Sequence, residues 1–332
     1  MNLHDNELVL PHIITTLQDF TTFAGPENIF LSVFESGSAD KTKLILENFM
    51  TNLLCNYEIV TSPIFLNVKA NHRIDFLAYV RNKAMTPFYR SSTSAGFYEQ
   101  HLKYDSVIFL NDAYACANDV LELEYQRILN DAGIVGGMDY VHTYHFEMLY
   151  DTWVAKDVEG LNFLIKPHDE IHYDEISKKR GSKQLPLQVT CLWNGMVSLN
   201  PLPFMNGYRF RRGHNRQPGQ VEPGECASSE CQTLCLDFIK MGLSRIVMVP
   251  RVKLAYNWAT YKAIKFDNTH FTNKIKAHQP FTEEEDLQVP FRDFEETFWC
   301  QPNYDSHRGS RSPKGEHFER YPVHQSPVQN DR

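Results

Sequence analysis

An amide and a carboxylate stand where a short buried strand is predicted to end. Residues 107–110 are apolar and strand-forming, and Asn111 and Asp112 follow them directly. Ligands of α/β proteins bind at the carboxyl ends of strands, and hard cations prefer carboxylates and other oxygen ligands. Asp112 is therefore a candidate ligand for a divalent cation that screens a charged leaving group. The alternative is a carboxylate that only caps the following turn, and the pair by itself leaves both open.

A positive charge lies on the apolar face of a helix predicted over residues 73–88. Arg81 shares that face with Ile74, Leu77, Ala78, Ala84, Met85 and Phe88. Burial of an unpaired guanidinium costs several kcal/mol, so Arg81 requires an anionic partner. That partner is either an internal carboxylate, such as Glu35 or Asp112, or an anionic ligand such as a diphosphate, which suits arginine's planar fork.

Glu230 opens a second helix of interest, predicted over residues 229–241. Ser228 or Ser229 can cap this helix, and the helix dipole favours an acid in its first turn. That structural explanation is sufficient for the pattern. An acid at a helix N-terminus after a glycine-containing loop is equally well placed to contact a hydroxylated substrate.

Cys226, Cys231 and Cys235 form a C-x4-C-x3-C cluster at the start of the same helix. Cys231 and Cys235 share one helical face with apolar residues, which predicts buried free thiols. A disulfide from Cys226 to a remote cysteine such as Cys191 is the alternative. Zinc is disfavoured, because the spacing fits none of the usual two-by-two ligand patterns.

Trp193, Asn194 and Gly195 interrupt a strand-like run in the second half of the chain. They are interpreted either as a sugar-stacking platform, with Asn194 and Gly195 as donor-binding residues, or as a β-bulge in a packed strand. The sequence contains no G-x-G-x-x-G, P-loop, G-x-S-x-G or H-E-x-x-H signature.

The elements that must position these residues alternate between strand and helix in the first half of the chain. Strands are predicted at residues 29–34, 57–63 and 107–110, and helices at 40–54, 73–88 and 118–133. The second half is richer in strand, with runs at 187–200 and 244–256 around the helix at 229–241. This pattern predicts an α/β fold with a parallel-rich sheet and ligands at the carboxyl edge of its strands.

Net charge and hydropathy argue against two classes of function, nucleic-acid binding and a membrane span within this sequence. The chain has 332 residues and a net charge of −8, so no global positive field attracts nucleic acid. No apolar run approaches the ~18–20 residues of a membrane span, although an upstream anchor would lie outside this sequence. We expect an edge segment at residues 1–25, one domain over 26–300 and a disordered polar tail over 301–332.

Eight blocks, in this order, resemble the fungal capsule-associated α-1,3-mannosyltransferase family (glycosyltransferase family 69). They are SVFESGSADKT, RIDFLAYVRNKAMTPF, VIFLNDAYACANDVLELE, GGMDYV, YDTWVAKDVEG, CLWNGMVSLNPLPF, ECASSECQTLCLDF and VMVPRVKLAY. The resemblance covers residues 29–256. It implies a single GT-A-type domain with a Rossmann-like mixed sheet flanked by helices.

The resemblance also implies a reaction and a location. The reaction is α-1,3 transfer from GDP-mannose to a mannose-containing glycan with retention, assisted by Mn²⁺ or another divalent cation. Family members work in the secretory pathway, in the Golgi lumen. They are held there by a membrane anchor, which this sequence does not contain. The oligomeric state stays open, and so does a non-catalytic role in glycan assembly or secretion.

Residue by residue, the resemblance assigns the donor site to the ends of predicted strands. GT-A enzymes hold the metal with an acid-x-acid motif, of which Leu110-Asn111-Asp112 retains only the last acid. Asp112 would be the metal ligand and Asn111 would lie beside the donor. Glu35 and Ser36, at the end of the first predicted strand, would face the nucleoside.

The remaining assignments concern the diphosphate and the acceptor. Arg81 would contact the diphosphate, and Glu230 resembles the acid that GT-A enzymes use near the acceptor. Asp139, in GGMDY, and Asp151, in YDTWV, are further acids that would line the site. The nucleophile is open: either a carboxylate attacks covalently, or departure and attack occur on one face of the sugar.

Overall fold

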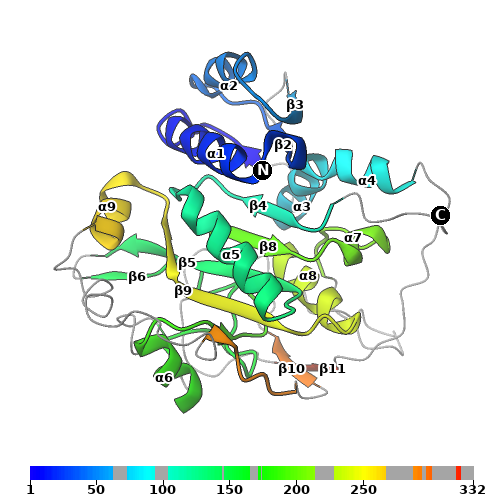
Figure 1. Ribbon diagram of the computed structural model, residues 1–332. Helices are drawn as coiled ribbons and strands as arrows, with labels where there is room; N and C mark the ends of the chain where they lie inside the picture. The colour runs from blue at the N-terminus through cyan, green and yellow to red at the C-terminus, as the bar shows by residue number, and fades with distance from the viewer. Residues whose placement is uncertain are drawn as a thin grey trace.

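The computed structural model describes most of the chain (Figure 1). The residues it describes are 1–62, 73–93, 104–143, 146–164, 171–172, 174–213, 228–266, 287–293, 297–300 and 319–322. Within these ranges no helix is long and apolar enough to cross a bilayer.

A small parallel sheet forms the N-terminal part. Its strand order is β1-β2-β3, with bounds β1 (Asn2–Leu3), β2 (Phe30–Glu35) and β3 (Asn56–Thr61). Helices α1 (Leu10–Ala24) and α2 (Thr42–Met50) cross between these strands, and a 3-10 turn (Pro26–Asn28) precedes β2. In Figure 1 this part lies at the top of the molecule. The carboxyl end of β2 carries Glu35, which pairs with Leu3 and Thr61 on its two neighbours.

A larger mixed sheet forms the centre of the molecule. Its order is β4-β8-β5-β9-β7, and β6 pairs with the far end of β5. The strands are β4 (Val107–Leu110), β5 (Ile134–His142), β6 (Glu147–Leu149), β7 (Leu187–Gln188), β8 (Met196–Leu199) and β9 (Ile246–Ala255). Only the β5–β9 pair is parallel; the other described pairs in this sheet are antiparallel.

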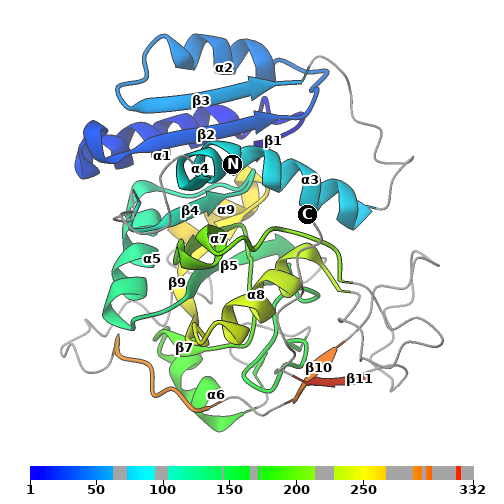
Figure 2. The same cartoon turned by 90° about the vertical axis from the view of Figure 1, so that its right-hand side faces the viewer.

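Helices cover both faces of this sheet. Figure 2 shows α5 (Ala117–Leu129) on one face and α8 (Glu230–Lys240) on the other. The other described helices are α3 (Arg73–Ala84), α4 (Thr86–Thr93), α6 (Glu175–Ser182), α7 (Leu202–Met205) and α9 (Trp258–Phe266). Helix α3 packs on β2 and also on α8, so it links the N-terminal sheet to the face of the central sheet that α8 covers.

The predicted fold class, α/β with a mixed sheet flanked by helices, is confirmed, but several details differ. The central sheet is not rich in parallel pairs, and the strand run expected over residues 187–200 is divided into β7 and β8. The strand at 107–110 forms as predicted, yet it joins the central sheet and runs antiparallel to β8. The helix predicted over 73–88 is interrupted at Met85 and continues as α4. Strand β5 was not predicted; it contains Gly136 and Gly137, a residue type that is depleted in strands.

Those two glycines are required by close packing inside the sheet. A Cβ on Gly136 would lie 2.0 Å from Leu192 Cδ1, and one on Gly137 would lie 2.7 Å from Val252 Cγ1. The register between β5 and β9 also shifts at this point. Glycine therefore serves here to let neighbouring chain approach a buried strand.

The expected polar tail contains one described strand. Strand β11 (Glu319–Pro322) pairs antiparallel with β10 (Thr297–Cys300). The composition of the tail did not predict this pairing. The other residues of the expected tail lie outside the described residues.

Candidate active site

The end of β4 is a junction of three elements. The backbone N–H of Asn111 donates to Gly195 O at 2.9 Å. The side-chain Oδ1 of Asn111 accepts from Arg81 Nη1 at 3.3 Å and from Trp193 Nε1 at 3.4 Å. Asn111 thus ties α3 and the segment before β8 to the end of β4.

Asp112 points away from that junction. Its side chain is exposed, and Oδ2 accepts from Asn6 Nδ2 at 3.1 Å. The backbone N–H of Asn6 in turn donates to Thr42 Oγ1 at 2.7 Å. Asp112 therefore lies between the central sheet and the N-terminal sheet, and it is accessible to a ligand.

Arg81 has an internal partner, but neither of the two that the sequence suggested. Its Nε lies 2.9 Å from Glu230 Oε1, and the side chains are only 12% and 2% exposed. The contact exists because α3 packs against α8. Three aromatic rings surround the guanidinium, with centroids at 4.9, 5.4 and 5.9 Å from Cζ: Trp193, Phe109 and Phe210.

Glu230 stands at the first position of α8. Ser229 caps the helix, its Oγ accepting from the backbone N–H of Gln232 at 3.0 Å. One carboxylate oxygen of Glu230 pairs with Arg81, and in the described part of the chain the other, Oε2, is buried without a hydrogen-bond partner. A buried acid with a free acceptor is a high-energy arrangement that a donor from a ligand would relieve.

Two further acids, Asp139 and Asp151, lie close to each other, and Asp151 is within reach of the charges of Arg81 and Glu230. Asp139, on β5, is fully buried; its Oδ1 accepts from the backbone N–H of Asp151 at 3.2 Å and its Oδ2 from the Tyr256 hydroxyl at 3.3 Å. Burial and then the charge of Asp151 raise the pKa of Asp139 to about 8. Burial also raises the pKa of Asp151.

Tyr256 connects these acids to the end of β4. Its hydroxyl group hydrogen-bonds Asn111 as well as Asp139, and it follows directly on β9. Sequence reasoning missed Tyr256, although its position one residue past a buried strand is the signal that singled out Asn111. It also missed Lys156, a buried cation whose charge favours the ionised form of Asp151.

Asn194 and Gly195 form a tight turn before β8. Both have positive φ, +23° and +78°, a conformation that is uncommon for a residue other than glycine. Asn194 is fully buried, and neither atom of its carboxamide has a hydrogen-bond partner among the described residues. The turn brings Gly195 O to Asn111, which is how these residues join the site.

Glu35 and Ser36 lie apart from this group. Ser36 Oγ donates to Leu3 O at 3.3 Å, and Glu35 Oε1 accepts from the backbone N–H of Ser38. Glu35 is fully buried, with no hydrogen-bond partner for its Oε2 in the described ranges. The structure thus brings Arg81, Asn111, Glu230, Asp139 and Asp151 into one network, whereas Glu35 and Ser36 are bonded within the N-terminal sheet.

Asp112 supplies the accessible carboxylate for a metal ion among the described residues of this group. In the part of the chain that the structure describes, no group of three or more His, Cys, Asp or Glu side chains could enclose an ion. Cations such as Mg²⁺ are commonly held by one or two carboxylates together with substrate phosphates. The exposed position of Asp112 fits that kind of site and does not fit a site made of protein ligands alone.

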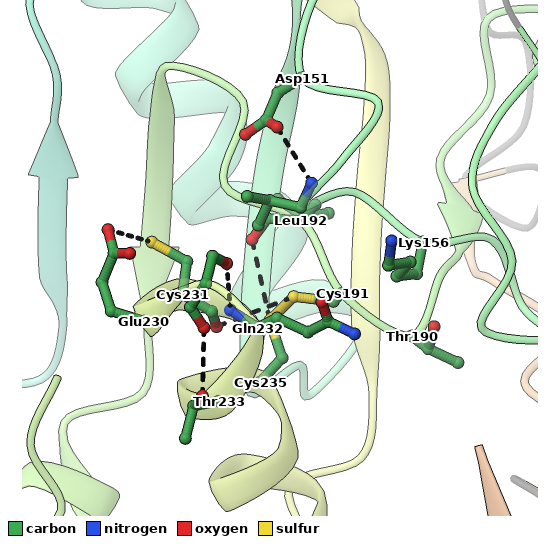
Figure 3. Close-up of a disulfide and its surroundings, with 12 residues drawn as sticks. Asp151, Lys156, Thr190, Cys191, Leu192, Glu230, Cys231, Gln232, Thr233 and Cys235 are labelled. Atoms are coloured by element: carbon green, nitrogen blue, oxygen red, sulfur yellow. Dashed lines mark hydrogen bonds between the residues drawn. A yellow bond between two sulfur atoms is a disulfide. The ribbon is translucent and has the colours of Figure 1, made fainter. Parts of the chain in front are cut away.

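A disulfide fastens α8 to the segment that leads to Trp193. Cys191 is bonded to Cys235 (Figure 3). The prediction of free thiols is wrong for Cys235, and the alternative pairing of Cys191 with Cys226 is wrong too. Cys231 is a buried free thiol, as predicted, and Cys226 lies outside the described residues.

Comparisons with known proteins agree with one another. A family model described as cryptococcal mannosyltransferase 1 matches residues 1–237. The alpha-1,3-mannosyltransferase CMT1 of Cryptococcus neoformans var. neoformans serotype D is 30% identical in a match 272 positions long, which covers 77% of this chain and 56% of that protein. The chain therefore spans little more than half of the length of this curated relative.

Solved structures with a similar course of the chain include two glycosyltransferases. The mannosyltransferase PcManGT from Pyrobaculum calidifontis, in complex with GDP-Man and Mn²⁺, is 12% identical with a TM-score of 0.40, over 79% of this chain and 58% of that one. TarS of S. aureus is 10% identical with a TM-score of 0.42, over 80% of this chain and 39% of that one.

Proposed function

This chain belongs to the cryptococcal mannosyltransferase 1 family, as its sequence blocks predict, and on that premise we propose that it is a hexosyltransferase that moves mannose from GDP-mannose to a mannose-containing glycan. We propose an α-1,3 linkage, formed with retention, in a GT-A-type domain. The observation that carries the proposal is the buried group of Arg81, Asn111 and Glu230, which joins a cation, an amide and an acid from three separate elements.

Arg81 would bind the diphosphate of the donor. Its aromatic surroundings and low exposure keep the guanidinium in place and weakly screened. A diphosphate carries more negative charge than the single carboxylate that pairs with Arg81 here. Donor binding would therefore compete with Glu230 for the guanidinium, and Glu230 would be released to act on the sugar or the acceptor.

Asp112 would hold a divalent cation such as Mn²⁺, which when bound offsets charge on the diphosphate leaving group. Asn111 would lie beside the donor. For the nucleoside we propose Glu35 and Ser36, because Glu35 Oε2 has no hydrogen-bond partner within the described residues and can accept from the N–H groups of guanine. Asn194 and Gly195 would contact the donor sugar.

Glu230, Asp139 and Asp151 are the proposed catalytic acids. Glu230 would orient the acceptor hydroxyl or stabilise positive charge that develops on the mannosyl carbon. Asp139, whose raised pKa keeps it protonated at neutral pH, would offer a hydrogen-bond donor in place of a second full charge. Asp151 would line the acceptor side.

We propose the secretory pathway, in the Golgi lumen, as the location. The support is the disulfide between Cys191 and Cys235, since disulfides persist mainly in oxidising compartments. The proposed partners are the sugar nucleotide and the glycan acceptor, and nucleic acid is not among them.

A second candidate function is a non-catalytic role in glycan assembly or secretion. The observation that favours it is Leu110, which occupies the place of the first acid of the metal motif. A non-catalytic member could keep the fold and the Arg81–Glu230 pair without turning over a donor.

A donor panel separates the two. Purified protein is incubated with GDP-mannose, UDP-glucose and other sugar nucleotides, with and without manganese, and free nucleoside diphosphate is measured. Release of GDP from GDP-mannose that depends on manganese supports the transferase. A well-folded protein that binds GDP but leaves every donor intact supports the non-catalytic role.

A further inference from the structure

An exposed aromatic ring adjoins the acids of the proposed site, of which Asp139 is buried and Asp151 is partly exposed. Tyr150 stands between β6 and Asp151, and its side chain is 53% exposed. Its backbone N–H donates to Asp139 O at 2.9 Å. The ring is therefore accessible to a ligand next to the proposed catalytic acids.

The ring of Tyr150 lies against the ring of Tyr256, with centroids 5.0 Å apart and planes inclined by 58°. The hydroxyl of Tyr256 in turn contacts Asp139 and Asn111. A continuous path therefore leads from solvent, through two tyrosine rings, to the carboxylates and to the amide at the end of β4. Tyr150 is the outer end of this path.

Proteins commonly bind sugars with an aromatic ring beside a carboxylate. A pyranose ring presents C–H groups on its faces, which pack on aromatic rings, and hydroxyls at its edges, which donate to carboxylates. Tyr150 offers the aromatic face, and Asp151 beside it is partly exposed and offers the acceptor. A neutral sugar can use both the ring and the carboxylate, whereas the charged half of the donor is assigned above to Arg81.

We propose that Tyr150 is the platform on which the accepting hexose of the glycan packs, with Asp151 receiving a hydrogen bond from one of its hydroxyls. This assignment rests on the proposed function and extends it by naming the acceptor subsite. It places the acceptor on the side of Asp139 and Asp151, and the nucleotide on the side of Arg81.

Binding of α-mannobiose in the presence of GDP tests the subsite without turnover. We expect wild-type protein to give saturation-transfer NMR signals from the disaccharide, and Tyr150→Ala to raise its Kd about tenfold, the loss expected for one aromatic contact. Tyr150→Phe keeps the ring and should remain close to wild type. Tyr125→Ala removes a tyrosine that is 43% exposed on α5 and serves as the matched control.

The transfer assay adds a second readout. With α-mannobiose as acceptor, Tyr150→Ala should raise the acceptor KM about tenfold with a far smaller effect on kcat, whereas Tyr125→Ala should change neither. A structural role for Tyr150 in supporting the acids would lower kcat instead. Calorimetric affinity for GDP and the melting temperature check that the variants are folded.

Each outcome has one meaning. Unchanged affinity for mannobiose in Tyr150→Ala, no binding by wild type, or loss of GDP affinity in place of mannobiose affinity would overturn the subsite. If wild type binds mannobiose through Tyr150 but never hydrolyses GDP-mannose, the subsite stands and the proposed enzymatic function fails.

Discussion

The guanidinium of Arg81 and the carboxylate of Glu230 lie 2.9 Å apart across 149 residues of chain, and both side chains are buried. The pair joins α3 to α8, and the same guanidinium also donates to the side-chain oxygen of Asn111. A buried ion pair of this kind contributes little to stability in itself, because desolvation offsets much of the attraction. The proposed function gives the pair a role, in which Arg81 exchanges Glu230 for the diphosphate of the donor.

Replacement of Arg81 by lysine should weaken GDP binding. Lysine keeps the charge but presents a point charge in place of a bidentate fork, and it loses the planar packing on Trp193. We expect the calorimetric Kd for GDP to rise at least tenfold. Arg90→Lys is the control, because Arg90 forms an exposed ion pair with Glu58. Equal GDP affinity in the two variants would exclude Arg81 from the phosphate site.

Replacement of Glu230 by glutamine should abolish transfer and retain GDP binding. A positioned acid contributes typically ~10²–10⁴-fold to rate, so transfer should fall by that range. Removal of one partner of a buried pair should also lower the free energy of unfolding by roughly 3 kcal/mol. If Glu230 served only as the structural partner of Arg81, stability would fall in the same way and transfer by the folded variant would stay intact.

The matched control for this substitution is Glu58→Gln. It removes the acid of the exposed pair with Arg90 and should cost less than about 1 kcal/mol, because solvent screens such pairs. Denaturant unfolding of the two variants, with transfer measured on the same samples, separates a stability effect from a catalytic one.

Replacement of Asp112 by asparagine should remove donor hydrolysis and leave the fold intact. The side chain is exposed, and the asparagine oxygen can still accept from Asn6, so the free energy of unfolding should change by no more than about 0.5 kcal/mol. Asp131→Asn, at another exposed aspartate paired with Arg245, should retain full hydrolysis. Normal activity, or collapse of the fold, in the Asp112 variant would favour the turn-capping role.

The ionisation of Asp139 should lower the free energy of unfolding as pH rises from about 6.5 to about 8, relative to a variant that lacks this carboxyl group. Burial and the neighbouring Asp151 raise the pKa of Asp139 to about 8, whereas the unfolded chain releases this proton near pH 4. The folded state therefore binds more protons across this interval, and the free energy of unfolding decreases with pH, by at most about 1.4 kcal/mol per unit.

Another group acts in the opposite direction over this interval, so the comparison with Asp139→Asn isolates the contribution of Asp139. Burial lowers the pKa of the Met1 amino group to about 5, which makes the free energy of unfolding rise between about pH 5 and pH 8. The lowered pKa values of His172, about 4, and Lys156, about 8, act in that rising direction too, but below about pH 6.5 and above about pH 8. Denaturant unfolding at several pH values should show the free energy of unfolding of wild type falling relative to that of Asp139→Asn as pH rises. The same slope in both proteins would contradict the assignment.

Reduction of the disulfide should destabilise the chain. Cys191 and Cys235 close a loop with a sequence separation of 44 residues, for which loop-closure entropy predicts a loss of roughly 4 kcal/mol. Peptide mapping under non-reducing conditions should recover the two cysteines in one linked peptide. Dithiothreitol should lower the melting temperature of wild type and have no such effect on Cys191→Ala/Cys235→Ala.

The local chemistry of the site was readable in the sequence, whereas its pairings were not. The end of β4, the first turn of α8 and the odd placement of Arg81 each follow from short-range patterns. The partner of Arg81 did not, because the α3–α8 contact that supplies Glu230 depends on tertiary packing. The disulfide of Cys235 was missed for the same reason.

Strand β5 shows a different limit. It carries Asp139 in the central sheet. Its two consecutive glycines are disfavoured in strands, but they are needed here because neighbouring side chains leave no room for a Cβ. Because tertiary packing determines these glycines, secondary structure could not be predicted correctly from the short sequence pattern around them. Tyr256 was not predicted as a site residue, although it directly follows a strand just as Asn111 does.

The most direct test of the account is the product formed from GDP-mannose, manganese and α-mannobiose by the purified chain. We predict that mass spectrometry detects a trisaccharide, that NMR assigns its new bond as an α-linkage to mannose, and that Glu230→Gln forms it at most one-hundredth as fast while still binding GDP. Contradiction would be a folded, GDP-binding wild-type protein that leaves both substrates unchanged, or a Glu230→Gln variant that forms the trisaccharide at the wild-type rate.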